Sequence, residues 1–365
     1  MSIAVAHKLA CISSLAKPYS YKSATHEHAR TVLQRAVPGL EVSLRMLAPY
    51  KAVRGKAVVL THRLIASVGL DSLSAAEACL MCLLASSDED ELTAAFQLFN
   101  QVMAEFGERT LGFVERALGP VLDRLAKAYE AVTLGVGETE AAHCLVEREF
   151  LLRQYMLLIQ HVMDHRCWQV LIMPTNYNRF QSMLTLMTNC VLGRENEGRA
   201  VTVTVRRCAL AALISTAAVF TGDVDAFAEK DHSVQSQVSA FRHCLFDISL
   251  PALLTSLVDK SLNLKDALSV NLVGDIAVLL WTLLLRINLQ ELLNYILSLC
   301  SRMNWPDGMK NTLLIALKEF GETVTRSRES GHQIGGIPTA FKDRIKDIAK
   351  ANYNSFSGVG YGGVK

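Results

Sequence analysis

The sequence has few aromatic residues, and no apolar run in it is long enough to span a membrane. Aromatics make up 7% of the 365 residues, and Leu, Ala and Val dominate the apolar half of the composition. Leu and Ala favour helices, whereas aromatic and β-branched residues favour strands. The longest apolar runs, 208–220 and 276–285, fall short of the roughly 18 residues that a membrane span needs. We expect no membrane insertion and interpret both runs as buried helices.

The sequence also lacks a strong charge imbalance, a secretory signal and a disulfide framework. The formal net charge is +2, which excludes a histone-like polyanion binder, so any nucleic-acid affinity must come from local patches. The first 20 residues contain no clean apolar segment followed by a small-residue cleavage site. The nine Cys residues are odd in number and scattered. We expect reduced thiols in an intracellular protein.

Motifs for nucleotide binding and nucleophilic catalysis are missing as well. The Gly-rich stretch "GVGE" at 135–138 is too short for a dinucleotide fingerprint or a phosphate-binding loop, and no predicted strand precedes it. No G-x-S-x-G elbow is present. Glu147 and Glu149 stand two residues apart, so on a helix they face different ways and cannot share a proton. We expect no catalytic residues, no cofactor and no enzymatic activity.

Two patterns resemble metal sites but have simpler interpretations. Cys79 and Cys82 form a single CxxC inside an apolar helix, where Cys behaves as a small buried hydrophobe. His161 and His165 stand at i and i+4, close to Cys167, but the Glu of an HExxH helix is absent. Polar residues near a helix end explain the pair, so we expect no metal site.

Helical periodicity runs through nearly the whole chain, and no strand alternation is sustained. The breaks between helices carry physical signals: Pro in "APYK", "MPTN" and "NWPDG", an acidic cap in "SSDEDE", and Gly after a helix in "LGVGETE" and "LGRENEG". The predicted helices cover residues 24–36, 39–48, 51–69, 73–85, 89–105, 108–132, 138–164, 176–192, 199–220, 236–257, 264–286, 289–302, 307–320 and 339–351.

Short connections predict antiparallel neighbours, and the helix pairs recur about every 35–60 residues, near the period of HEAT repeats. We therefore predict an all-α fold, an α-solenoid of HEAT-like antiparallel helix pairs with an ARM-type superhelix. A globular helical bundle is the alternative. The predicted divisions are an N-terminal segment at 1–22, the repeat array at 23–321, and at 322–365 a polar linker, a short amphipathic helix and a Gly-rich tail.

Basic residues give the most informative local signal. Seven lie between residues 30 and 63, interrupted by one acid, Glu41, and a second cluster spans 194–207. Such patches contact phosphates without reading bases, although a solvated helix face is the simpler explanation for either cluster alone. No RNP, KH or zinc-finger signature is present. The candidate phosphate contacts are Arg45, Lys51, Arg54, Lys56, Arg63, Arg206 and Arg207.

Four stretches together resemble the C-terminal part of the exportin-T family of karyopherin-β proteins, most strongly over 140–320. They are "EREFLLRQYMLLIQHVM", "RRCALAALISTAAVFTG", "FRHCLFDISLPALLTSLVDKSLNLKDALSVNLVGDIAVLLWTLLL" and "LLNYILSLCSRMNWPDGMKNTLLIALKE". Each is similar to a long helix, or a helix pair with its linker, in the order that the family has them. Residues 1–139 fit the same resemblance as preceding repeats.

The resemblance implies a carrier that binds mature tRNA together with Ran-GTP and shuttles between nucleus and cytoplasm through contacts with nuclear pore proteins. Cooperative loading of cargo and Ran is a coupling free energy between two sites, and it needs no catalysis. A full exportin of this type is longer, so the main Ran contact is expected in repeats that this chain lacks. The alternatives are a HEAT-repeat scaffold or another karyopherin that binds proteins only, and an unrecognised helical enzyme.

Overall fold

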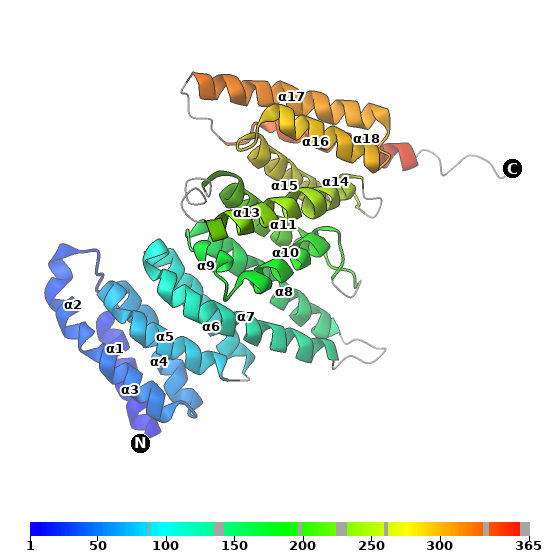
Figure 1. Cartoon of the computed structure of the whole chain (residues 1–365). Coiled ribbons are helices and arrows are strands. Elements are labelled where there is room, and N and C mark those ends of the chain that lie inside the picture. Colours follow the sequence, from blue (N-terminus) through cyan, green and yellow to red (C-terminus); the bar gives the residue numbers. More distant parts are fainter. Residues whose placement is uncertain are drawn as a thin grey trace. The chain divides into compact units, whose positions relative to one another are not determined.

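The computed structural model describes residues 1–86, 88–134, 142–195, 199–223, 232–258, 262–330 and 336–357. Within these ranges the regular structure is helical, and one isolated β-bridge joins Arg194 to Ala200. The predicted all-α solenoid class is confirmed, whereas the ARM-type superhelix of the whole chain stays a prediction. The chain divides into two compact units, Met1–Met173 and Pro174–Lys365 (Figure 1), which we describe separately.

Unit 1 is a stack of helices in which successive members pack side by side. α1 packs along α4, α4 contacts both α5 and α6, and α7 contacts α5 and α8. The apolar faces of α4 to α7 are almost completely buried, which is the main source of helix stability in such arrays. The principal helices are α1 (Ser2–Ala16), α2 (Glu27–Gln34), α3 (Ala36–Leu47), α4 (Lys51–Val68), α5 (Leu73–Leu84), α6 (Glu89–Phe106), α7 (Leu111–Leu134), α8 (Ala142–Asp164) and α9 (Gln169–Ile172).

A repeated turn shows that unit 1 contains an internal repeat. α4 and α6 each have 18 residues and end at Gly69 and Gly107, which have φ of +79° and +54°. A short 3₁₀ turn follows each glycine, and the hydroxyl of Ser72 or Thr110 donates to the glycine carbonyl at 2.7 Å. The equivalent glycines, and the starts of α4 and α6, are therefore 38 residues apart. The sequence signal is G-x-x-[ST]-L, a recurring motif that hydrophobic periodicity alone does not reveal.

Unit 2 continues the same style of packing with two irregular turns. α10 packs on α11, α11 on α15, and α16 on α17. Two π-helical turns, η4 (Val219–Asp223) and η5 (Leu245–Ser249), widen the helices where Phe220 and Leu245 enter the core. The principal helices are α10 (Tyr177–Val191), α11 (Val203–Ala218), α13 (His232–Cys244), α14 (Leu250–Leu257), α15 (Ala267–Leu284), α16 (Leu289–Arg302), α17 (Asp307–Glu329) and α18 (Thr339–Ser357).

Helical structure extends beyond the boundaries predicted at residues 22 and 321, while the division into domains stays a prediction. Residues 2–16 form α1, whose Ala6, Leu9, Ser13 and Ala16 are buried in unit 1. At the other end, α17 continues to Glu329 because Val324 keeps its apolar face in contact with the core. The predicted Gly-rich tail after residue 357 and most of the predicted linker, at 331–335, lie outside the described residues.

Among the residues that the structure describes, three helical segments are long and apolar enough to cross a membrane by length and composition alone. They are Lys51–Leu84, Val203–Thr221 and Ala267–Leu284, and about half of each apolar window is buried against neighbouring helices. Their apolar windows exceed the uninterrupted runs of the sequence because single polar residues, such as Thr61, lie inside them. The expected absence of membrane insertion stays a prediction.

Candidate nucleic-acid interface

Positive charge is concentrated in the first four helices of unit 1. Residues 1–70 contain ten Lys and Arg against two Glu, an excess of eight, whereas the whole chain carries only +2. The remaining residues are therefore net negative. A local excess of one sign attracts opposite charges, so this segment is the one in which we expect contacts with a polyanion.

Three of the predicted cations are exposed on this surface. Lys56 and Arg63 lie two turns apart on the outward side of α4, with the half-exposed Val59 between them, and Arg45 lies on the outward side of α3. In the part of the chain that the structure describes, none of the three makes an ion pair. Their charges are thus available to phosphates, which surface Lys and Arg contact without sequence preference.

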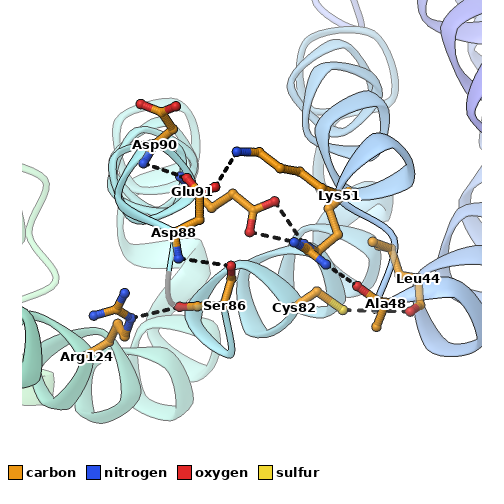
Figure 2. A network of polar contacts seen from close by, with 10 residues as sticks. Leu44, Ala48, Lys51, Cys82, Ser86, Asp88, Asp90, Glu91 and Arg124 are labelled. Carbon is orange, nitrogen blue, oxygen red and sulfur yellow. Dashed lines mark hydrogen bonds and ion pairs between the residues drawn. The ribbon is translucent and has the colours of Figure 1, made fainter.

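Lys51 is already engaged with an acidic residue at the start of α6, as Figure 2 shows. Arg54 is engaged with a second one. Lys51 pairs with Asp88, and this contact lowers the pKa of the Asp88 carboxyl and raises the pKa of Lys51. The Arg54 guanidinium donates to both carboxylate oxygens of Glu91, at 2.9 and 3.1 Å, and to the Ala48 carbonyl. Lys51 remains 63% exposed, but the Arg54 side chain is only 12% exposed.

This network arises from the way α6 begins. Asp88 is the N-cap of α6, and its side chain accepts from the backbone N–H groups of Asp90 and Glu91, as helix N-termini favour. The predicted acidic cap therefore also forms ion pairs, because Asp88 binds Lys51 and Glu91 binds Arg54 of the preceding repeat. Arg54 serves packing between repeats, and we leave it out of the candidate surface.

The second basic cluster does not form a comparable surface. Arg206 is 4% exposed and donates to the Val191 carbonyl at 3.0 Å and to Ser256 Oγ at 3.3 Å. Its guanidinium also lies against Gly193, whose φ of +83° ends the turn after α10. Arg207 pairs with Asp275 of α15 at 2.6 Å. Arg206 thus joins α10 to α14 inside unit 2, and its place among the candidate phosphate contacts is corrected on this ground.

Three further cations extend the surface of unit 1 and were not among the predicted contacts. Lys8 and Lys17 are exposed at α1, and Arg35 is exposed between α2 and α3. Lys8 and Lys17 were missed because residues 1–22 had no assigned structure. The helical spacing of Ala6, Leu9, Ser13 and Ala16 was the signal for α1. We use the name basic face for the exposed cations of these helices taken together, which are Lys8, Lys17, Arg35, Arg45, Lys51, Lys56 and Arg63.

The residues examined for metal binding and redox chemistry have ordinary structural surroundings. The rings of His161 and His165 stack, and Nδ1 of His161 lies 3.3 Å from Nε2 of His165. The pKa of His161 is lowered mainly by burial and also by the neighbouring His165. Among the described residues, no group of three or more His, Cys, Asp or Glu is arranged to hold a metal ion. All nine cysteines are free, and burial raises the pKa of Cys79 to about 12.

Glu147 meets another carboxylate, although not the one next to it in sequence. It lines a groove of about 850 Å³ between α5, α6, α7 and α8, together with Glu89, Arg124 and Lys127. The pKa of Glu147 is raised mainly by its partial burial. A hydrogen bond with Glu89 and repulsion from the Glu89 charge raise it further. The partner comes from another helix, so sequence spacing alone did not indicate this pair.

The helices define a HEAT-like repeat protein whose N-terminal helices carry exposed basic residues. The family model of Exportin-T matches residues 1–327. The chain belongs to the Exportin-T family, which is a family of transport receptors and not of enzymes. The match includes residues 1–139, where the resemblance in sequence was weaker. No curated protein matches the chain.

Proposed function

We propose that this protein is a nuclear export receptor that binds mature tRNA together with Ran-GTP and carries it from the nucleus to the cytoplasm. The observation that carries the proposal is the Exportin-T match over residues 1–327. The basic face supports it independently, because a tRNA carrier must neutralise phosphates without reading a sequence. Nuclear pore proteins are the partners expected during passage, and the protein should shuttle between both compartments.

The tRNA part of the proposal is tested by charge reversal at three exposed cations of the basic face. The variant carries Arg45→Glu, Lys56→Glu and Arg63→Glu, none of which breaks an ion pair among the described residues. Each lost phosphate contact should reduce the slope of log K against log salt by roughly 0.7–0.9. We expect weaker tRNA binding and a slope flatter by about 2–3, measured by filter binding.

A matched control separates local contacts from the change in total charge. Arg326, Arg344 and Lys350 are exposed in unit 2, and their reversal to Glu changes the net charge by the same amount. Equal loss of affinity in both triple variants would exclude the basic face as the tRNA surface. Repeating the assay with and without Ran-GTP tests cooperative loading. A protein that binds Ran-GTP or other proteins, but no tRNA at any salt, would be a karyopherin or scaffold for protein partners only.

A further inference from the structure

The last described helix, α18, lies in a groove of unit 2. It begins at Thr339, beyond residues 1–327 that match the family, and it contacts α15 and α17. Figure 1 shows it beside the closing helices of unit 2. Its buried residues are spaced as one helical stripe: Phe341, Ile345, Ile348 and Ala349 are each 3% exposed or less. The predicted amphipathic helix therefore exists, and its apolar side is covered.

The groove has specific features for each part of this stripe. The Phe341 ring lies between Trp281 of α15 and Phe320 of α17, with centroid distances of 5.6 and 5.2 Å. Gly274 of α15 has no side chain, and the Lys346 chain passes within 3.6 Å of where a Cβ would stand. Aromatic contacts of this kind add to the free energy of burial, and a glycine permits close approach of two helices.

A polar contact fixes the position of α18 along the groove. The side-chain amide of Asn352 donates to the carbonyl of Val258, which ends α14, at 3.3 Å. Carbonyls at a helix end lack partners within the helix, so this contact satisfies one of them. The outward positions Asp343, Arg344, Asp347 and Lys350 are exposed. Docking is thus specified by an aromatic residue, Phe341, by aliphatic residues four and seven positions after it, and by an amide eleven positions after it.

We propose that α15, α17 and the end of α14 form a helix-docking groove, which α18 occupies in cis and which accepts from a protein partner an amphipathic helix with the same spacing. This is the helix-in-groove mode of recognition, with anchors at i, i+4 and i+7. The buried Trp281 indole N–H has no acceptor among the described residues. A partner helix that brings an oxygen within reach of this N–H would gain a hydrogen bond that α18 does not make.

The full-length chain with Phe341→Ala and Ile345→Ala tests the groove, with a labelled synthetic peptide of residues 336–357 as the probe. Fluorescence anisotropy should show about tenfold or tighter peptide binding to this variant than to the wild type, whose tethered helix competes at an effective concentration on the order of mM. The control variant, Arg344→Ala with Asp347→Ala on the exposed side, should behave like the wild type. A peptide carrying the two Ala substitutions should bind neither.

Absence of peptide binding by a cooperatively folded double variant would overturn the proposal, as would equal binding to variant and wild type. If the double variant does not fold, hydrogen exchange of the wild-type chain replaces it. Excess ¹⁵N-labelled peptide should then accelerate amide exchange in the resident α18, and unchanged exchange would equally overturn the proposal. tRNA affinity is expected to stay the same in all variants, so the outcome is independent of the proposed transport function.

Discussion

The contact between Arg54 and Glu91 differs in kind from the other ion pairs of unit 1. Both side chains are nearly buried, at 12% and 7% exposure, whereas Arg116 and Glu77 form a pair in which Arg116 is 60% exposed. A buried charge that loses its partner is left without compensation, whereas an exposed one is solvated by water. The two pairs therefore make a matched comparison within unit 1.

We predict that Glu91→Ala lowers the free energy of unfolding by about 3–5 kcal/mol, because it leaves the Arg54 guanidinium buried and unpaired. The corresponding change at the exposed pair, Glu77→Ala, should cost about 1 kcal/mol or less. Urea denaturation followed by circular dichroism measures both. Similar losses for the two variants would show that the Arg54 site is hydrated and not buried as the structure has it.

The Glu147 carboxyl gives unit 1 a contribution to stability that depends on pH. Its pKa in the folded protein is raised above the ordinary 4.5 by burial and then by Glu89. Folding therefore favours the protonated form, and this contribution is present below pH 4.5 and is lost as the pH rises through the folded pKa. Glu147→Gln cannot ionise, so it should stabilise the protein more at pH 7 than at pH 4.

Melting temperatures of wild type and variant at the two pH values provide the measurement. Glu89→Gln is the partner variant, since it removes the charge that opposes ionisation of Glu147, and it should reduce the same pH dependence. A difference in melting temperature between Glu147→Gln and wild type that does not change with pH would contradict the raised pKa.

At the scale of elements, the two glycine turns of unit 1 set where one helix of a repeat ends and the next begins. Gly107 has φ +54° and ψ −134°, a conformation that residues with a Cβ rarely adopt. We predict that Gly107→Ala lowers the free energy of unfolding by about 1–3 kcal/mol. The added Cβ would also lie 3.4 Å from the His165 carbonyl. Chemical denaturation of the full chain measures the effect.

Gly39 is the control for this substitution. It lies within α3, has no atom within 4 Å of an added Cβ and needs no positive φ. Gly39→Ala should therefore stabilise the chain by about 0.5–1 kcal/mol, since Ala is the better helix former. If Gly107→Ala cost no more stability than Gly39→Ala, the positive φ would not be what requires glycine at position 107.

Local signals predicted most helices, because each boundary depends on residues close in sequence. Asp88 and Asn288 supply N-caps, and Pro306 ends the connection before α17. The pairing of side chains was not predictable in the same way. Nothing near Arg54 or Arg206 in the sequence distinguishes them from the exposed Lys56, because their partners lie on other helices. The burial of a cation is thus decided by packing, and the candidate site was only partly predicted.

At the scale of the whole molecule, the uneven charge distribution predicts where RNA contacts the chain. Ten Lys and Arg against two Glu fall within residues 1–70, and the rest of the chain is net negative. We predict that ultraviolet cross-links to tRNA, mapped by mass spectrometry, lie mainly in peptides of α1 to α4, because acidic surfaces repel the phosphate backbone.

Salt provides the control for that experiment. Cross-links on the basic face should decrease steeply between low and moderate salt, because counterion release drives phosphate contacts. Cross-links concentrated in unit 2, or a yield insensitive to salt, would contradict an electrostatic interface at the N-terminal helices. Competition with an unstructured polyanion then distinguishes shape recognition from charge alone.

The 38-residue register of unit 1 has a consequence for how such a chain can change length. Lys51–Asp88, Arg54–Glu91 and Arg116–Glu77 each join residues that are 37 or 39 positions apart, as His62 and Gln101 do. Each of these contacts therefore spans about one period. Duplication or deletion of one complete period would keep the spacing between successive helix pairs. The ion pairs would not all be kept, because the positions one period after Lys51 and Arg54 hold Glu89 and Leu92.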